Sequence, residues 1–436
     1  MSSARYVVLG LAPVRSEWFR SVARWANEAA IPVEFIKCIS ATEVRARLDE
    51  GRPFSAVLVD ASVPGADRDL FDAARTNGCA TVIVDNGLVE RDWGSLGVSG
   101  VLTEPFTSAD LLTALERVGQ RVEQATDLSG RTERTETTSF GGRTVVVTGT
   151  GGIGSSTVAM AVAQGLAREP DRTRLVLADM ALRSSQAMMH DARDMVPGLV
   201  ELVDGHRLGT PEDDDVARTI YDLPDRGYHL LLGLRHERDW HAITARSLAA
   251  SWASLDRLYT TVVADVTGEF EGTDETGAND LEDRNRLART AARRADLVVA
   301  VGAPGAWGVH RLVQTILSLL ELGVPGERIL PCVNRAPRQA RAKAGITAAI
   351  GDLVTSRAPD ASALPSPVYV PERRQIEAML RDGEALPSQV VEPVTSAVHA
   401  LLSRSTTAPR PVVADTPVPV APGSLGAWDA AEGWDE

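Results

Sequence analysis

Glycine and hydroxyl residues between two apolar runs carry the clearest chemical signal in the sequence. Residues 143–163 read RTVVVTGTGGIGSSTVAMAVA, which predicts a strand, a tight glycine turn and a helix that begins directly after the turn. Glycine lets backbone N–H groups approach a ligand closely, and the helix aims its positive dipole end at the same point. The stretch therefore predicts a phosphate-binding loop.

This loop fits two motifs. As a P-loop, Gly149-x4-Gly154 is followed by two serines, so Ser156 takes the place of the hydroxyl that meets Mg²⁺ and Ser155 replaces the phosphate-binding lysine. As a dinucleotide fingerprint, Gly149-x-Gly151-x-x-Gly154 is followed 25 residues later by Asp179, near the place of a ribose-binding acid. The loop alone does not choose between these motifs. A glycine turn without a ligand is a third interpretation.

Composition limits the classes of function. The chain has 436 residues, enough for two domains, and its net charge of −14 argues against nucleic acid or an anionic membrane as its main partner. Lys37 and Lys343 are the only lysines, and neither is near the loop. The 3 cysteines are isolated, which fits a reducing compartment. We expect a cytoplasmic protein without a signal peptide or membrane-spanning segment.

Alternating apolar runs and amphipathic segments predict an α/β protein. The first part of the chain predicts a doubly wound domain, and the second predicts a P-loop domain with a mostly parallel sheet. A polar stretch without periodicity separates them, and the Pro-rich, acidic end predicts a disordered tail. The expected boundaries are 1–118, 119–142 (linker), 143–403 and 404–436 (tail).

Polar residues follow three further predicted strands in the second domain. Asp179 ends LVLAD, Asp265 lies near the end of RLYTTVVADVTG, and Asn334 lies near the end of ILPCVNRA. Asp265 fits the Walker B acid of a P-loop protein, which would hold the Mg²⁺ shell through water, so Asp265 and Ser156 are expected to hold Mg²⁺ together.

The first domain resembles a response-regulator receiver domain, with Asp60 after AVLV at the phospho-acceptor position. Two departures predict that it does not take up phosphate. Leu9, Gly10 and Leu11 stand where the family has its Mg²⁺-binding acids, and Glu104 replaces the family's lysine in EPF. We therefore expect a pseudo-receiver used for docking or dimerisation, with Asp60 capping a turn.

The second domain resembles the ParA/MinD superfamily of P-loop ATPases, in the order loop, Asp179, Asp265, Asn334. With the receiver-like front, it is similar to the CpaE/TadZ-like branch, which includes actinobacterial septum-site-determining (Ssd-like) proteins and has P-loops without the lysine. The position of the family's dimer-signature lysine is Thr150. The resemblance implies catalytic roles for Asp179 and Asp265. It also implies nucleotide contacts from Gly149, Thr150, Gly151, Gly152, Ile153, Gly154, Ser155, Ser156, Thr157 and, against adenine, Asn334.

The resemblance implies ATP or ADP with Mg²⁺ as ligands, and the missing lysine predicts weak or absent hydrolysis. One alternative is an active ATPase in which Arg183 replaces the lysine. Another is an NAD(P)-binding Rossmann protein, although Tyr-x-x-x-Lys is absent because Val33 and Gln339 precede the two lysines by four residues.

The implied cellular role is that of a landmark or regulator for septum placement or for Tad-type pilus or secretion assembly. The implied partners are a second copy of the chain and a secretion or pilus ATPase or divisome components. We expect no direct contact with nucleic acid and only indirect membrane association, with the cell pole or septum reached through partners.

Overall fold

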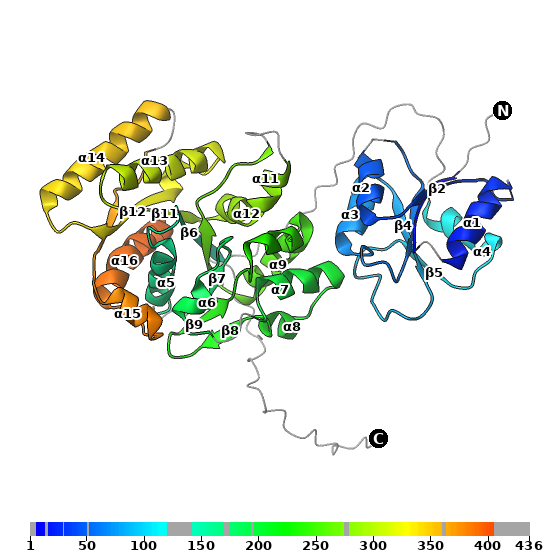
Figure 1. The fold of residues 1–436 in the computed structure, drawn as a ribbon, viewed down its shortest axis with the longest axis horizontal. Coiled ribbons are helices and arrows are strands. Elements are labelled where there is room, and N and C mark those ends of the chain that lie inside the picture. The colour runs from blue at the N-terminus through cyan, green and yellow to red at the C-terminus, as the bar shows by residue number, and fades with distance from the viewer. Residues whose placement is uncertain are drawn as a thin grey trace, which may run out of the picture.

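The computed structural model describes residues 6–13, 16–28, 30–49, 52–119, 142–168, 174–192, 196–273, 279–359 and 363–404. Apart from their end residues, the predicted linker and tail lie outside these ranges. Within the described residues the chain forms two sheets with helices on their faces, which confirms the predicted α/β class (Figure 1). We call residues 6–119 the N-terminal unit and residues 142–404 the C-terminal unit.

The N-terminal unit has a five-stranded parallel sheet in the order β2-β1-β3-β4-β5. This is the order of doubly wound, flavodoxin-like folds. The central strands β1, β3 and β4 form because they are runs of β-branched and aliphatic residues that are buried on both faces of the sheet, whereas the edge strands β2 and β5 are partly exposed. The elements are β1 (Tyr6–Leu11), α1 (Glu17–Asn27), β2 (Val33–Cys38), α2 (Ala41–Asp49), β3 (Ala56–Asp60), α3 (Arg68–Thr76), β4 (Ala80–Asp85), β5 (Gly100–Thr103) and α4 (Ser108–Val118).

The C-terminal unit has an eight-stranded sheet in the order β13-β12-β11-β6-β10-β7-β9-β8, parallel except for β8. Its strands are β6 (Arg143–Gly149), β7 (Leu175–Asp179), β8 (Tyr221–Leu223), β9 (Tyr228–Leu231), β10 (Thr261–Thr267), β11 (Leu297–Gly302), β12 (Ile329–Ala336) and β13 (Val368–Pro371). The strand that leads into the glycine loop, β6, lies between β10 and β11. The loop therefore opens at the middle of the sheet.

Helices cover both faces of this sheet. They are α5 (Ser155–Leu166), α6 (Gln186–Met189), α7 (Leu199–Leu208), α8 (Asp213–Ala217), α9 (Ala245–Leu258), α11 (Asn279–Arg284), α12 (Arg286–Arg294), α13 (Ala306–Glu321), α14 (Ala340–Arg357), α15 (Ile376–Arg381) and α16 (Ser388–Arg404), with 3-10 turns η1 (Glu237–Ala242) and η2 (Gly326–Arg328). Alternate residues of the strands pack on opposite faces, with α5 and α16 on one and α7, α9, α12 and α13 on the other. The central strands are thus buried on both faces.

Helix α3 of the N-terminal unit lies against α7 and α9 of the C-terminal unit (Figure 1). Arg207 Nη1 pairs with Asp67 Oδ2 at 3.2 Å, and the hydroxyl of Thr244 donates to Asp69 Oδ1 at 2.9 Å. Asp67 and Asp69 are both buried in this contact. The contact includes loops at the carboxyl edge of the N-terminal sheet, because Asp67 lies in the loop after β3 and the hydroxyl of Thr210 donates to the carbonyl oxygen of Ser95, after β4, at 3.4 Å.

Candidate nucleotide-binding site

The glycine loop joins β6 to α5, as predicted. Gly152 and Gly154 have φ angles of 83° and 85°, in the left-handed region that favours glycine. A Cβ on Gly149 would lie 2.8 Å from the carbonyl oxygen of Val301 in the neighbouring strand. The turn therefore requires glycine at these positions, and it leaves the N-terminal N–H groups of α5 facing outward.

A side chain from another strand supports this loop. The amide Nδ2 of Asn334, in β12, donates to the carbonyl oxygen of Ile153 at 2.8 Å, and the N–H of Arg335 donates to Asn334 Oδ1 at 2.9 Å. A Cβ on Gly154 would lie 2.5 Å from that Nδ2. The structure thus places Asn334 behind the loop, where its amide holds the loop backbone.

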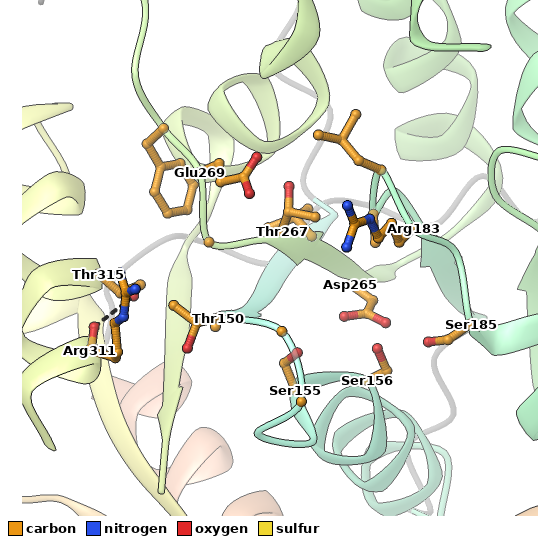
Figure 2. Close-up of a pocket in the computed structure, with 18 of the residues that line it drawn as sticks. Thr150, Ser155, Ser156, Arg183, Ser185, Asp265, Thr267, Glu269, Arg311 and Thr315 are labelled. Atoms are coloured by element: carbon orange, nitrogen blue, oxygen red, sulfur yellow. Dashed lines mark hydrogen bonds between the residues drawn. The ribbon is translucent and has the colours of Figure 1, made fainter. Parts of the chain in front are cut away.

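A cavity of about 1390 Å³ lies in front of the loop, at the carboxyl edge of the sheet (Figure 2). Ordinary small-ligand pockets have roughly 300–1,000 Å³, so this cavity is large enough for a nucleotide. Of the residues predicted from sequence, it is lined by Gly149, Thr150, Gly151, Gly152, Gly154, Ser155, Ser156, Thr157 and Asp265. The other three predicted residues, Ile153, Asp179 and Asn334, are not among its lining residues.

Asp265 and Ser156 face each other at the floor of the cavity (Figure 2). Asp265 is 1% exposed, and Gln186 Nε2 donates to its Oδ2 at 2.8 Å. Burial raises the pKa of Asp265, the charge of Asp179 raises it further, and hydrogen bonds from Ser156 and Gln186 oppose the increase. Burial thus disfavours the charged form of Asp265, and a cation bound beside it would favour that form.

Gln186 is a site residue that the sequence did not reveal. Its Nε2 also donates to the carbonyl oxygen of Ser156 at 3.1 Å, so one side chain links α5, β10 and α6. Its Oε1 is buried without a hydrogen-bond partner among the described residues. Nothing in the residue type or spacing of Gln186 marks it in sequence, because its partners are 30 and 79 positions away.

Asp179 lies behind this floor and is 0% exposed. Its carboxylate accepts the backbone N–H groups of Ser185 and Gln186 at 2.9 Å each, and that of Ala181 at 3.3 Å. Burial raises its pKa, and these hydrogen bonds oppose the increase. The geometry gives Asp179 the task of shaping residues 181–186, which place Gln186 beside Asp265.

Arginines line the rest of the cavity. Arg183 Nε pairs with Glu237 Oε2 at 3.0 Å, and the Arg183 side chain is 84% exposed. Arg284 pairs with Glu237 and also with Glu269. Both guanidinium groups are therefore shared with carboxylates. Arg311 and Arg335 also line the cavity.

Asp60, at the predicted phospho-acceptor position of the N-terminal unit, is surrounded by hydrogen-bond donors of that unit. The indole Nε1 of Trp18 donates to Asp60 Oδ2 at 2.8 Å, and the backbone N–H and hydroxyl of Ser62 donate to Oδ1 at 3.0 and 2.6 Å. Burial and the charges of Asp60 and Glu17 raise the pKa of Glu104, which stands at the family's lysine position. Both oxygens of Asp60 are thus engaged internally.

The described residues contain no cluster of three or more His, Cys, Asp or Glu side chains placed to hold a metal ion.

No family model and no curated protein matches this chain. Solved structures that resemble it include a ParA family ATPase from Chlorobium tepidum (15% identity, 59% of this chain, 98% of that one, TM-score 0.47). They also include the cell division ATPase MinD of Pyrococcus furiosus (16%, 60%, 99%, 0.43) and an ATP complex of a Cyanothece McdA variant (18%, 61%, 97%, 0.43). At these identities and TM-scores, the likeness decides neither family nor function.

Among the described residues, every helix is too short or too polar to cross a bilayer.

Proposed function

We propose that the C-terminal unit binds a nucleoside triphosphate with Mg²⁺. The observation that carries this proposal is the glycine loop, which opens into α5 at the rim of a large cavity with Ser156 and Asp265 beside it. Backbone N–H groups and a helix N-terminus bind phosphate without a specific side chain.

The residues at the cavity floor fit Mg²⁺. The hydroxyl of Ser156 and the carboxylate of Asp265, which both line the cavity, are hard oxygen donors of the kind that Mg²⁺ takes directly or through water. A bound Mg²⁺ would neutralise phosphate charge. Ser156 would hold it from the loop, and Asp265 would hold its water shell from β10.

The strand order favours this reading over a dinucleotide site. In the Rossmann order 3-2-1-4-5-6, the strand with the ribose-binding acid lies next to the strand that leads into the glycine loop. Here β10 separates β7, which carries Asp179, from β6. The Asp179 carboxylate is also buried and accepts three backbone N–H groups, so it cannot accept from a ribose hydroxyl in the cavity.

We expect slow or absent hydrolysis. Charge stabilisation supplies most phosphoryl-transfer catalysis, and the loop has Ser155 in place of its lysine. Arg183, our predicted substitute, is paired with Glu237. Asp179 is not among the residues that line the cavity, so we expect it to take no direct part in orienting a water there.

One titration tests the ligand class. Isothermal titration of the full chain with ATP and with NAD, each with and without Mg²⁺, should give ATP binding that Mg²⁺ strengthens and no NAD binding. NAD binding that is indifferent to Mg²⁺ would support the dinucleotide alternative instead.

For the cellular role we propose a ParA/MinD-like positioning protein of the CpaE/TadZ type, a landmark for septum placement or for Tad-type pilus or secretion assembly. The resemblance in the loop and strand-end residues supports this role, together with an N-terminal unit in which Trp18 and Ser62 engage both oxygens of Asp60. A positioning scaffold of this kind acts as a dimer. Light scattering over a concentration series, with and without ATP, should show a dimer; a monomeric mass in both conditions counts against the scaffold.

A further inference from the structure

Among the described residues that line the cavity is an arginine that is held in place by an amide and an aromatic ring. Arg311, on α13, donates from Nη1 to Gln314 Oε1 at 3.3 Å, and its guanidinium carbon lies 4.7 Å from the centre of the Trp307 ring. Within the described part of the chain, no ion pair involves Arg311. Its full charge is therefore open to a ligand, unlike that of Arg183 or Arg284.

The fold brings this arginine to the glycine loop. Strand β11 pairs with β6, with Val301 opposite Gly149, and α13 begins four residues after β11 ends. The first turns of α13 therefore stand beside the start of the loop. Figure 2 shows Arg311 on the Thr150 side of the loop and Arg183 on the opposite side, near Asp265.

We propose that Arg311 supplies the positive charge that the loop lacks, by binding phosphate oxygens of the nucleotide. This inference rests on the proposed function of the same cavity. A guanidinium presents two parallel N–H donors to phosphate oxygens and stays charged at every physiological pH. Without nucleotide, the exposed ring of Trp307 provides a cation–π platform for the group, and phosphate then competes with that platform.

Affinity for Mg·ATP measures this charge directly. In the full chain, Arg311→Ala should weaken Mg·ATP binding by about 10- to 100-fold, the usual loss for a charge-assisted hydrogen bond. The loss should be smaller for AMP, since the contact is to the phosphate chain. Arg357→Ala is the matched control, because Arg357 is an exposed arginine at the far end of α14.

A double substitution separates charge from structure. Ser155→Lys returns a cation to the P-loop position, so it should restore binding to Arg311→Ala far more than it strengthens binding of the wild type. A merely structural role of Arg311 would give independent, additive effects. Additive effects would overturn the proposal.

Trp307 gives a second readout. Mg·ATP should change the tryptophan fluorescence of the wild type, because the Arg311 guanidinium leaves the Trp307 ring. This change should be absent in Trp307→Phe and in Arg311→Ala.

The possible results distinguish a failure of the proposed role of Arg311 from a failure of the proposed nucleotide binding. Failure of the wild type to bind ATP overturns both. Wild-type binding that Arg311→Ala leaves intact overturns only the role of Arg311. Weakened binding in Arg335→Ala but not in Arg311→Ala would assign the charge to Arg335 and also overturn it.

Discussion

Two aspartates near the carboxyl ends of parallel strands, Asp60 and Asp265, have opposite surroundings. Both are almost fully buried, at 6% and 1% exposure. Trp18 and Ser62 donate to Asp60 within the N-terminal unit, whereas Asp265, which accepts from Ser156 and Gln186, also lines a cavity beside a phosphate-type loop. A carboxylate at a strand end is therefore not a site by itself. What distinguishes Asp265 is that one of its hydrogen-bond partners, Ser156, belongs to the glycine loop and lines the cavity with it.

The largest expected effect is the loss of all nucleotide binding when the loop cannot turn. Gly154→Val places a branched side chain at φ 85° and against Asn334, so Mg·ATP binding should fall below detection in calorimetry. Gly323→Val is the matched control, since Gly323 has φ 91° and open space around its Cβ position. The left-handed backbone should cost each variant about 1–2 kcal/mol of stability, and the contact with Asn334 should cost Gly154→Val more. Equal loss of binding in both would show that strain, not the loop, is responsible.

The next effect compares the two aspartates directly. Asp265→Asn removes the charge that attracts Mg²⁺, so ATP affinity in Mg²⁺ should fall by about 10- to 100-fold to its metal-free value. Asp60→Asn should leave ATP affinity unchanged. An equal change in ATP affinity for the two variants in the same titration would show that Asp265 has no special part in nucleotide binding.

A smaller effect concerns stability at Asp60. Trp18→Phe removes the indole donor and leaves Asp60 Oδ2 without a partner in a buried place, so the free energy of unfolding should fall by about 1–3 kcal/mol. Trp25→Phe on the same helix is the control, because both tryptophans lie against the Phe106 ring but the hydrogen bond to Asp60 Oδ2 comes from Trp18. Urea denaturation measures the free energy of unfolding of both variants. Equal losses would show that the hydrogen bond from Trp18 to Asp60 does not stabilise the fold. Neither variant should form a beryllofluoride adduct at Asp60.

The smallest effect is in the pH dependence of stability without nucleotide or Mg²⁺. Because burial raises the pKa of Asp265, the folded chain keeps a proton that the unfolded chain releases. The free energy of unfolding should therefore fall as pH rises from the ordinary aspartate pKa toward the raised one. Asp265→Asn should make this fall shallower. An unchanged slope in urea midpoints over a pH series would mean that Asp265 is ionised throughout.

Local patterns in the sequence were sufficient to predict the strands and helices around both aspartates, as well as the glycine loop and its approach to Asp265. These features depend on β-branched runs, helix periodicity and glycine spacing, all of which act over short distances. The partners of the aspartates could not be predicted. Trp18 reaches Asp60 over 42 positions, and Gln186 reaches Asp265 over 79. Asp179 looked like a ligand-facing acid, but whether it turns toward the cavity or the backbone depends on the path of residues 181–186.

Hydrogen–deuterium exchange of the full chain with and without Mg·ATP tests the central claim most directly, because it examines both aspartates in one sample. We expect slower exchange on addition of Mg·ATP in residues 149–158 and in the α6 segment around Gln186, and unchanged exchange in residues 56–62. Protection around Asp60, or no protection of the glycine loop at saturating Mg·ATP, would contradict the assignment of the nucleotide to the C-terminal unit.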